Sequence, residues 1–383
     1  MKRLLLIGAG HAHAQVLRDW VTAPLPGVQL VLVSPSALAP YSGLVPGWLA
    51  GHYRFEDICI DFAALAAAAG ATLVIDELTA LDPALRQVRL AGGQRLGYDL
   101  LSLNVGSTLR PPSFPSSFPA PPQVLALRPL GQLRQRWASV LASPGLSDPF
   151  DQSGRPGPLH VTAVGGGAAG VESLLAVLAR LRQQQPGRAL SARLLTRGSL
   201  LPGMAPGAAR AAQRALLAAG AQVLTDSAFD PQTAPPGCDL LLWATGAQAH
   251  PWQAHSGLAV SAEGYIAVDA HLQSLSHPQV LAVGDCAHWA PPLPKAGVFA
   301  VRMGPVLSHN LRALLGGQPL RHYQPQRRYL ALLATADGSA IGAWGGLAAS
   351  GPWLWRWKDH IDRAFLARFR LPGAAVAAQH RSE

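Results

Sequence analysis

Two glycine-rich turns, each lying between an apolar strand and a helix, constrain this chain more than any other feature. The first turn, Gly-Ala-Gly-His-Ala-His at residues 8–13, follows an apolar run at residues 4–7. The second, Gly-Gly-Gly-Ala-Ala-Gly at residues 165–170, follows an apolar run at residues 161–164. Glycine lets the backbone turn tightly and approach a phosphate, and the next helix offers free N–H groups to the anion. Each turn therefore predicts a dinucleotide site.

One turn of this kind is a weak signal, but this chain carries two. A third motif, Val-Gly-Asp at residues 283–285, follows a predicted strand further along the chain. Together the three motifs predict two different dinucleotides bound face to face. A flavin and a nicotinamide fit that arrangement, so the sequence predicts redox chemistry.

The order of the predicted elements indicates an α/β fold with two Rossmann-like dinucleotide-binding domains. A chain of 383 residues is too long for one ordinary core. A strand at 279–283 resumes the pattern of the first domain, so we expect a discontinuous flavin domain with a nicotinamide domain inserted. The expected units are 1–120 (flavin domain, first part), 121–247 (nicotinamide domain), 248–325 (flavin domain, second part) and 326–383 (strands and an amphipathic helix).

Hydrophobic runs and turn residues place the individual elements. Prolines at residues 110–122 forbid a helix or a central strand and mark a linker. The second strand–turn–helix–strand unit spans residues 159–195. Other expected strands are 4–7, 29–33, 72–76, 87–91, 94–96, 100–104, 221–224 and 239–245, and the expected helices are 13–21, 62–69, 130–142 and 208–219.

Charge and cysteine usage exclude several classes of protein. The net charge is +10, and residues 321–383 carry nine basic and four acidic side chains. No aromatic-basic sheet motif or zinc module accompanies this charge, which argues against a nucleic-acid partner. The three cysteines form no C-x-x-C pair and no metal-ligand spacing, so we expect a reducing compartment and neither a metal nor a redox-active disulfide. No run of eighteen apolar residues is present, and the short apolar N-terminus is interpreted as a strand.

Further motifs carry a resemblance to a known family. They are Pro-Tyr-Ser-Gly-Leu-Val-Pro-Gly at 40–47, Ala-Gly-His-Tyr at 50–53, Lys-Ala-Gly at 295–297 and Trp-Lys-Asp-His-Ile-Asp-Arg at 357–363. With the two glycine-rich turns, they resemble the FAD-dependent pyridine nucleotide-disulfide oxidoreductase superfamily, which includes the type II NADH dehydrogenases. The nearest likeness is to the branch often found fused ahead of selenide, water dikinase, and it covers essentially the whole chain.

The resemblance implies FAD in the first domain and NADH or NADPH in the inserted one. Asp285 corresponds to the aspartate that hydrogen-bonds the flavin ribityl chain, and residues 244–246 match the Ala-Thr-Gly that ends a strand in this superfamily. Residues implied for FAD are Gly8, Gly10, His11, Ala12, Ser34, Tyr41, Ser42, Asn104, Gly106, Gly284, Asp285, Lys295, Ala296 and Gly297. Those implied for NAD(P)H are Gly165, Gly167, Ala168, Gly170, Arg197 and Gly246.

Two positions depart from the family pattern. His13 stands where the first turn should have its third glycine, so we expect the helix and the strand to pack less closely there. Ser34 ends the second strand, where the family has an acidic residue that grips the adenosine ribose; serine is a weaker, neutral partner. At the equivalent place in the inserted domain, Arg197 follows Thr196. Arg197 is either a partner for the 2′-phosphate of NADPH or a solvated arginine.

Lys295 and Glu172 are the candidate catalytic residues. Hydride transfer from a nicotinamide to a flavin needs two aligned rings rather than an acid or a nucleophile. A cation such as Lys295 at the pyrimidine end of the flavin would stabilise its anionic reduced form; otherwise Lys295 is a surface lysine. Glu172 is expected on the first turn of its helix, where it either faces the cofactor rings or balances the helix dipole.

Three further side chains invite a chemical role. His11 and His13 are two residues apart at the start of a helix and splay apart, so a shared metal is not expected. We expect His11 to donate toward a phosphate and His13 to be a packing residue. Cys286 is expected to be a small buried residue rather than a sulfide-oxidising thiol.

The C-terminal segment predicts an amphipathic helix. Aromatic and aliphatic side chains recur every fourth residue, and arginines crowd the remaining positions. Tryptophan with arginine on such a helix is typical of an in-plane membrane anchor, as in the type II NADH dehydrogenases. The alternative is a stripe that packs on its own protein or across a homodimer. The stripe consists of Trp353, Trp357, Ile361, Phe365 and Phe369.

These observations lead to one main interpretation and two alternatives. The main interpretation is an FAD-dependent NAD(P)H dehydrogenase that passes electrons to a quinone or another small-molecule acceptor. One alternative is a non-catalytic flavin-binding partner protein linked to selenium metabolism. The other is an enzyme like sulfide:quinone oxidoreductase, which the cysteine set disfavours. We expect a cytoplasmic protein, with peripheral contact at the inner face of the cell membrane as an option.

Overall fold

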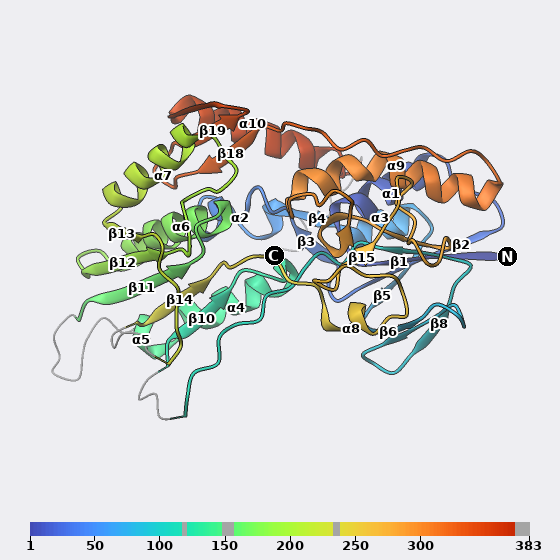
Figure 1. Ribbon diagram of the computed structural model, residues 1–383, viewed down its shortest axis with the longest axis horizontal. Coiled ribbons are helices and arrows are strands. Elements are labelled where there is room, and N and C mark those ends of the chain that lie inside the picture. Colours follow the sequence, from blue (N-terminus) through green and yellow to red (C-terminus); the bar gives the residue numbers. More distant parts are fainter. Residues whose placement is uncertain (117–120, 148–156, 233–237, 372–383) are drawn as a thin grey trace, which may run out of the picture.

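The computed structural model describes residues 1–116, 121–147, 157–232 and 238–371. Two parallel five-stranded sheets, each with helices packed on it, form the two halves of the molecule. The last strands and the last helix lie along one side of both halves, at the top of Figure 1. The architecture confirms the expected α/β class with two Rossmann-like units.

The first sheet and its helices comprise β1 (Lys2–Ile7), α1 (His11–Thr22), β2 (Val28–Ser34), α3 (Phe62–Ala68), β5 (Thr72–Ile75), β9 (Leu100–Leu103), β16 (Val280–Ala282) and α9 (Gly297–Gly316). The strand order is β16-β9-β1-β2-β5, and every neighbouring pair is parallel. β1, β2 and β9 are nearly continuous runs of Leu, Val and Ile, as expected for strands buried on both faces.

Alternate residues of β1 enter two different cores. Leu4 and Leu6 belong to the core that includes α1 and α9, whereas Leu5 and Ile7 belong to a second core on the opposite face. That second face is covered by a small antiparallel sheet, in which two strands form the expected hairpin. Its strands are β6 (Leu78–Asp82), β7 (Gln87–Leu90) and β8 (Arg95–Gly97).

The second sheet and its helices comprise β10 (Gln123–Ala126), α4 (Leu133–Leu141), β11 (Leu159–Val164), α6 (Ala168–Gln184), β12 (Leu190–Leu195), α7 (Pro206–Ala218), β13 (Ala221–Leu224) and β14 (Leu240–Trp243). The order is β10-β14-β11-β12-β13, again parallel. β10 was not expected from the sequence, because its four residues follow directly on the proline-rich linker.

The two connections between the sheets run side by side. Thr108 and Gln248 form an antiparallel bridge, with N–H···O distances of 2.9 and 3.0 Å between their backbones. The backbone N–H of Arg110 also donates to the side-chain oxygen of Gln248 at 3.0 Å. The chain therefore leaves the first sheet and returns to it at one place. The limits of the domains themselves stay a prediction.

Short elements join these units. A two-stranded antiparallel pair and a short helix precede α3, and a parallel two-stranded pair follows the second sheet. They are β3 (Leu38–Pro40), α2 (Val45–Leu49), β4 (Cys59–Asp61), α5 (Pro144–Ser147), α8 (Pro251–Ala254), β15 (Ile266–Ala267), β17 (Ala287–His288) and 3-10 turns at Glu56–Ile58, Leu130–Gln132 and Gly284–Cys286.

The C-terminal unit is an antiparallel sheet followed by a helix, as expected. Its elements are β18 (Ala331–Ala334), β19 (Ala340–Trp344), β20 (Leu347–Gly351) and α10 (Pro352–Ala367). β20 packs against α7 of the second sheet. Within the described part of the chain, no helix is long and apolar enough to cross a membrane.

The expected apolar stripe of α10 is divided in the structure. Trp353, Trp357 and Ile361 are exposed, whereas Phe365 and Phe369 are buried. The stripe was expected on a single face, but α10 packs inward through a second set of side chains that includes an ion pair. This inward face comprises Leu354, Lys358, Asp362, Phe365 and Leu366.

The ion pair on α10 is buried and ties the helix to the first half of the molecule. Lys358 Nζ lies 2.6 Å from Asp362 Oδ2, and each side chain is only 8% exposed. Lys358 also donates to the backbone carbonyl of Gly43, in the loop before α2. A buried ion pair contributes little net stability, but losing one partner leaves an uncompensated charge in the core.

We expect Asp362→Ala to lower the free energy of unfolding by about 3–5 kcal/mol, because Lys358 is then buried without its counter-charge. Asp57→Ala is the control, since the Arg54–Asp57 pair is exposed and such pairs contribute at most about 1 kcal/mol. Urea unfolding of both variants measures the difference. Equal losses in the two variants would contradict the buried pairing.

Candidate active site and cofactor pockets

A long cavity follows the C-terminal edge of the first sheet. Its volume is about 1320 Å³, its open mouth included. It passes the ends of all five strands, from β16 through β9, β1 and β2 to β5. Open α/β sheets bind dinucleotides at this edge. Nine residues that the sequence implied for FAD line the cavity: Gly8, Gly10, His11, Ser34, Ser42, Asn104, Gly106, Asp285 and Gly297.

The first glycine turn is shaped by its contact with Asn104. Gly8 has a φ of +97°, and a Cβ at Gly8 or at Gly10 would overlap the backbone or side chain of Asn104. Asn104 Oδ1 accepts a hydrogen bond from the N–H of Ala12 at 3.1 Å, in the first turn of α1, and Asn104 Nδ2 donates to the carbonyl of Val283 at 3.1 Å. Asn104 therefore joins β9, β16 and the start of α1, and the bare turn fits a pyrophosphate.

His13 replaces the third glycine without leaving a gap. Its side chain is fully buried, which confirms the expected packing role. Its Nδ1 lies 2.7 Å from the carbonyl of Gly8, and its Nε2 lies 2.8 Å from the hydroxyl of Ser102 in β9. Both ring nitrogens are thus satisfied inside the fold.

His11 lies on the cavity wall and contacts the C-terminal helix. Its ring meets the rings of Tyr41 and Phe365 edge-on, with centroids 5.3 and 5.9 Å away. Burial lowers the pKa of His11 to about 4, so the ring is neutral at neutral pH. Burial and the Asp362 carboxylate raise the pKa of Tyr41. The aromatic cluster joins the first glycine turn to α10.

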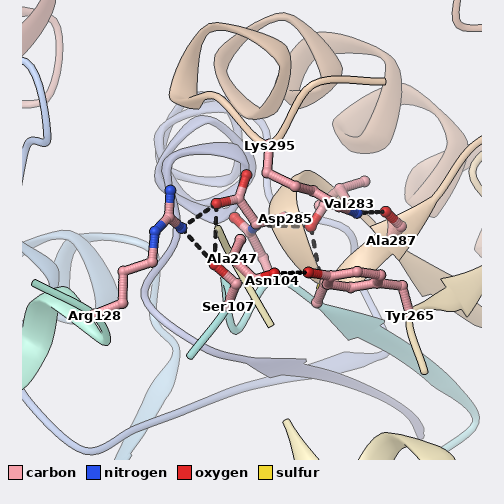
Figure 2. Close-up of polar contacts among 10 residues, drawn as sticks. Asn104, Ser107, Arg128, Ala247, Tyr265, Val283, Asp285, Ala287 and Lys295 are labelled. Atoms are coloured by element: carbon pink, nitrogen blue, oxygen red, sulfur yellow. Dashed lines mark hydrogen bonds and ion pairs between the residues drawn. The ribbon is translucent and has the colours of Figure 1, made fainter. Parts of the chain in front are cut away.

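An arginine from the second half reaches the carboxylate of Asp285. Figure 2 shows Arg128, Ser107 and Asp285 pointing toward one another. Arg128 pairs with Asp285 Oδ2 and also donates to the Ser107 hydroxyl, which lies 3.2 Å from the same carboxylate oxygen. Arg128 follows β10 and lines the same cavity. Sequence reasoning missed it, because nothing near Arg128 in the sequence indicates a contact with Asp285.

Lys295 lies close to Asp285 but behind the cavity wall. Its ammonium donates to the carbonyl of Ala287 at 2.6 Å and lies 3.7 Å from the centroid of the Tyr265 ring (Figure 2). Burial lowers its pKa, and the neighbouring Cys286 and Asp285 oppose that shift. Ala296 is the N-cap of α9, whose first residue, Gly297, reaches the cavity. Lys295 is therefore a half-buried cation near Asp285, at the end of the cavity beside β16.

The second glycine turn, before α6, is tightly packed against the protein at two glycines and open to a ligand at a third. Gly165 has a φ of +126°, and a Cβ there would overlap the carbonyl of Ala244. Gly170 is equally confined, against the carbonyl of Gly165. Gly167, by contrast, has open space where a Cβ would lie, and Ala168 begins α6. This is the geometry that a second pyrophosphate needs.

The residues beyond the second cradle differ in exposure. Thr196 is buried against Gly166, whereas Arg197 is exposed at the end of β12. Gly246 is exposed after β14, with open space around it. Arg197 is therefore accessible to a ligand in this cradle.

The expected position of Glu172 was wrong. Glu172 is the fifth residue of α6, so it lies beyond the first turn and does not balance the helix dipole there. Its carboxylate accepts a hydrogen bond from the N–H of Ala334, in β18, at 2.8 Å. Burial raises its pKa from 4.5 to about 7, although Lys358 acts in the opposite direction. Glu172 thus connects α6 to the C-terminal unit.

The three cysteines are free thiols in poor environments for a thiolate. Cys286 is buried and lies near the carbonyls of Val283 and Leu103. Burial raises the pKa of Cys286 to about 11 and that of Cys59 to about 12, and it also raises the pKa of Cys238. Since the thiolate is the reactive form, none of the three is primed for nucleophilic chemistry.

Comparison with known proteins decides the family. The family described as pyridine nucleotide-disulphide oxidoreductase matches residues 2–304. The chain belongs to this family. Its members are oxidoreductases that bind FAD and NAD(P)H. The two cradles and the long cavity fit those two cofactors.

Curated relatives are distant. The chain is 26% identical over 319 residues to the demethylphylloquinone reductase NdbB of Synechocystis sp., covering 77% of this chain and 74% of the relative. It is 24% identical over 273 residues to the ferroptosis suppressor protein 1 of Taeniopygia guttata, covering 65% of each protein. The chain thus spans somewhat less than two thirds of the length of that second relative.

Solved structures share the fold at low identity. The sulfide:quinone oxidoreductase of Aquifex aeolicus superposes with a TM-score of 0.74 at 16% identity, over 97% of this chain and 92% of that one. An engineered water-forming NADPH oxidase bound to NADPH gives a TM-score of 0.66 at 15% identity, over 89% of this chain and 74% of that one. These likenesses confirm the expected fold.

We expect the stability of the wild-type protein to fall as the pH rises from about 5 to 8, by on the order of 2 kcal/mol from Glu172 alone. The folded state holds this proton more tightly than the unfolded chain does, because the pKa is raised on folding. Glu172→Gln removes that dependence, and Glu56→Gln, an exposed glutamate, is the control. Urea unfolding across this pH range measures it; parallel curves for wild type and Glu172→Gln would contradict the raised pKa.

Proposed function

We propose that this protein is an FAD-dependent NAD(P)H:quinone oxidoreductase that prefers NADPH and works at an anionic membrane surface. The observation that carries the proposal is the long cavity at the edge of the first sheet, joined through the Arg128–Asp285 pair to a second parallel sheet with an open glycine cradle. Bound FAD would accept a hydride from the nicotinamide and pass electrons on.

The side chains divide the work of binding and charge control. Asn104 shapes the pyrophosphate turn, Asp285 and Arg128 hold the ribityl end, and Gly167 leaves space for the nicotinamide cofactor. We assign Lys295 to the pyrimidine end of the flavin, where an internal cation favours added negative charge. We keep Glu172 as the candidate proton donor to the acceptor, because burial raises the pKa of its carboxyl group to about 7 and the group is then partly protonated at neutral pH.

A quinone is the acceptor class that the similar proteins favour. The demethylphylloquinone reductase and the sulfide:quinone oxidoreductase are both named for a quinone. Sulfide as the electron donor is less well supported, because burial raises the pKa of all three thiols. The nicotinamide cofactor is therefore the better donor.

The preference for NADPH rests on the end of β12. An exposed arginine, Arg197, stands there beside the neutral Thr196. A carboxylate at such a position would accept a hydrogen bond from the 2′-hydroxyl of NADH, whereas an arginine pairs with the 2′-phosphate of NADPH. The engineered NADPH oxidase carries, among its replacements, an aspartate changed to alanine and the next residue changed to arginine. Thr196 and Arg197 likewise place an uncharged residue before an arginine.

The membrane contact rests on an exposed apolar face of the C-terminal unit. Trp353 and Trp357 stack on each other at the surface of α10, with ring centroids 6.4 Å apart. Exposed arginines flank them, including Arg356. Aromatic side chains with neighbouring cations suit the interface of an anionic bilayer. The face, which we call the tryptophan face, comprises Trp353, Trp357 and Ile361 on α10; Trp344 and Leu347 are exposed on the preceding β-hairpin.

Anaerobic mixing of the FAD-loaded protein with NADPH is expected to bleach the flavin absorbance, and adding a short-chain quinone is expected to restore it. Gly167→Val should abolish the bleaching while FAD stays bound, because the added side chain enters open space in the cradle without a clash. Gly346→Val, at another open glycine, is the control. Stopped-flow absorbance measures both steps. A flavin that neither NADPH nor NADH reduces would overturn the proposed function.

Arg197→Ala is expected to raise the KM for NADPH by about 10- to 100-fold, since a charge-assisted hydrogen bond contributes about 1.5–3 kcal/mol. The KM for NADH should stay unchanged. Arg214→Ala, an exposed arginine on α7, is the matched control. Steady-state kinetics with both nucleotides measures the change. Equal effects of Arg197→Ala on NADH and NADPH would show that Arg197 does not read the phosphate.

The wild-type protein is expected to sediment with anionic vesicles at low salt, and the double variant Trp353→Gln/Trp357→Gln is expected to stay in the supernatant. Leu217→Gln, at an exposed leucine on α7, is the control. Truncation is unsuitable, because α10 also contributes buried side chains. A wild-type protein that ignores these vesicles would exclude the membrane contact. A wild-type dimer that the double variant dissociates would assign the tryptophan face to a homodimer.

A further inference from the structure

The residue that ends β2 is a weak partner for the adenosine ribose. Ser34 is buried, and its hydroxyl donates to the backbone carbonyl of Ser36 at 2.8 Å. The one proton of this hydroxyl is already used, and its neutral oxygen is a weaker acceptor for ribose hydroxyls than a carboxylate would be. The oxygen also accepts from the N–H of Ser36 at 3.4 Å. Recognition of the adenosine half of FAD therefore needs further side chains.

The order of the strands locates the adenosine end of the cavity. Asp285 and Arg128 mark one end, beside β16, and the turn at Gly8 and Gly10 lies in the middle, at β1. β2 and β5 lie beyond β1 on the opposite side. A dinucleotide with its pyrophosphate at the turn and its ribityl chain at Asp285 must place its adenosine beside β2 and β5.

Two carboxylates line this end of the cavity, and one of them already accepts hydrogen bonds from the backbone. Asp76 follows β5, and its carboxylate accepts from the N–H groups of Glu77 and Gly92 at 2.7 and 3.1 Å. Glu77 lines the cavity beside it and is exposed. The negative charge of Glu77 acts on His250, which lines the same cavity.

His250 presents a buried polar atom at this end. It is the N-cap of α8, where its backbone N–H donates to the side chain of Gln253 at 2.8 Å. Its Nε2 atom is buried and makes no hydrogen bond of good geometry within the described part of the chain, although the backbone of Val105 lies near the ring. Burial lowers the pKa of His250, while the backbone of Val105 and the carboxylate of Glu77 act in the opposite direction. Such an atom is costly unless a ligand or water satisfies it.

We propose that His250 and Glu77 recognise the adenosine half of FAD and replace the missing acidic residue at the end of β2. Glu77 accepts hydrogen bonds from adenosine hydroxyl or amino groups, and His250 Nε2 supplies a further hydrogen bond in the same pocket. The half-buried ring of Trp252 adds apolar surface there. The inference rests on the FAD site of the proposed function and extends it to the choice of FAD over FMN, which lacks the adenosine.

The test is flavin titration of the full-length apoprotein, followed by the quenching of flavin fluorescence. His250→Asn keeps a good helix cap and removes Nε2, and Glu77→Gln removes the charge. Each is expected to raise the Kd for FAD about tenfold, the effect of losing one hydrogen bond of about 1.4 kcal/mol. The Kd for FMN is expected to stay unchanged in both variants.

Two further variants bracket the result. Ser34→Ala is expected to raise the Kd for FAD less than His250→Asn or Glu77→Gln does, because its hydroxyl proton is already used inside the fold. His255→Asn changes a histidine at the other end of α8, away from the cavity wall. An unchanged FMN affinity also shows that each variant has kept a folded pocket.

The outcomes separate this inference from the proposed function. If His250→Asn or Glu77→Gln weakens FAD and FMN equally, or weakens neither, the proposal is wrong. If Ser34→Ala weakens FAD as much as they do, the end of β2 still reads the ribose and the proposal is also wrong. Flavin titration needs neither a nicotinamide nor an acceptor, so a protein that fails to oxidise NADPH would leave this measurement intact.

Discussion

The parallel order of the first sheet is the constraint on which the site depends. Because neighbouring strands point the same way, all five carboxyl ends meet at one edge, and the groups that follow them come together there. Asn104 turns this edge into a single surface, since its side chain joins the start of α1 to the end of β16. Side chains far apart in the sequence thereby line one cavity in the order of the strands rather than of the chain.

Much of this architecture could be predicted because it follows from local sequence patterns. α1, β2 and β5 end within about two residues of the expected limits, since apolar runs and glycine or proline boundaries define them. The two glycine cradles are equally local, because spacing alone fixes the turn before a helix. β10 was missed, because a strand of four residues after a proline-rich stretch is too short to show a period.

The rest of the site depends on contacts that no local pattern encodes. Arg128 meets Asp285 across 157 residues, and Lys358 meets the carbonyl of Gly43 across 315. Periodicity predicted the apolar stripe of α10 but not the burial of Lys358. A lysine is buried only when a partner neutralises its charge, and that partner cannot be read from the apolar pattern. Glu172 was expected on the first turn of α6 but lies just beyond it, since the helix begins at Ala168. A one-residue change in the start of a helix is enough to redirect a carboxylate.

The two halves of the molecule differ in how early their sheets can be completed during synthesis. The inserted sheet is contiguous and has all five strands once β14 has emerged, whereas the first sheet lacks β16 until some 40 residues later. Domains generally fold as units in the order of their synthesis. The later half can thus complete its sheet while the earlier one still waits for its last strand. The two connections lie together at the bridge between Thr108 and Gln248, so completing the second sheet first brings the two parts of the first sheet close to each other.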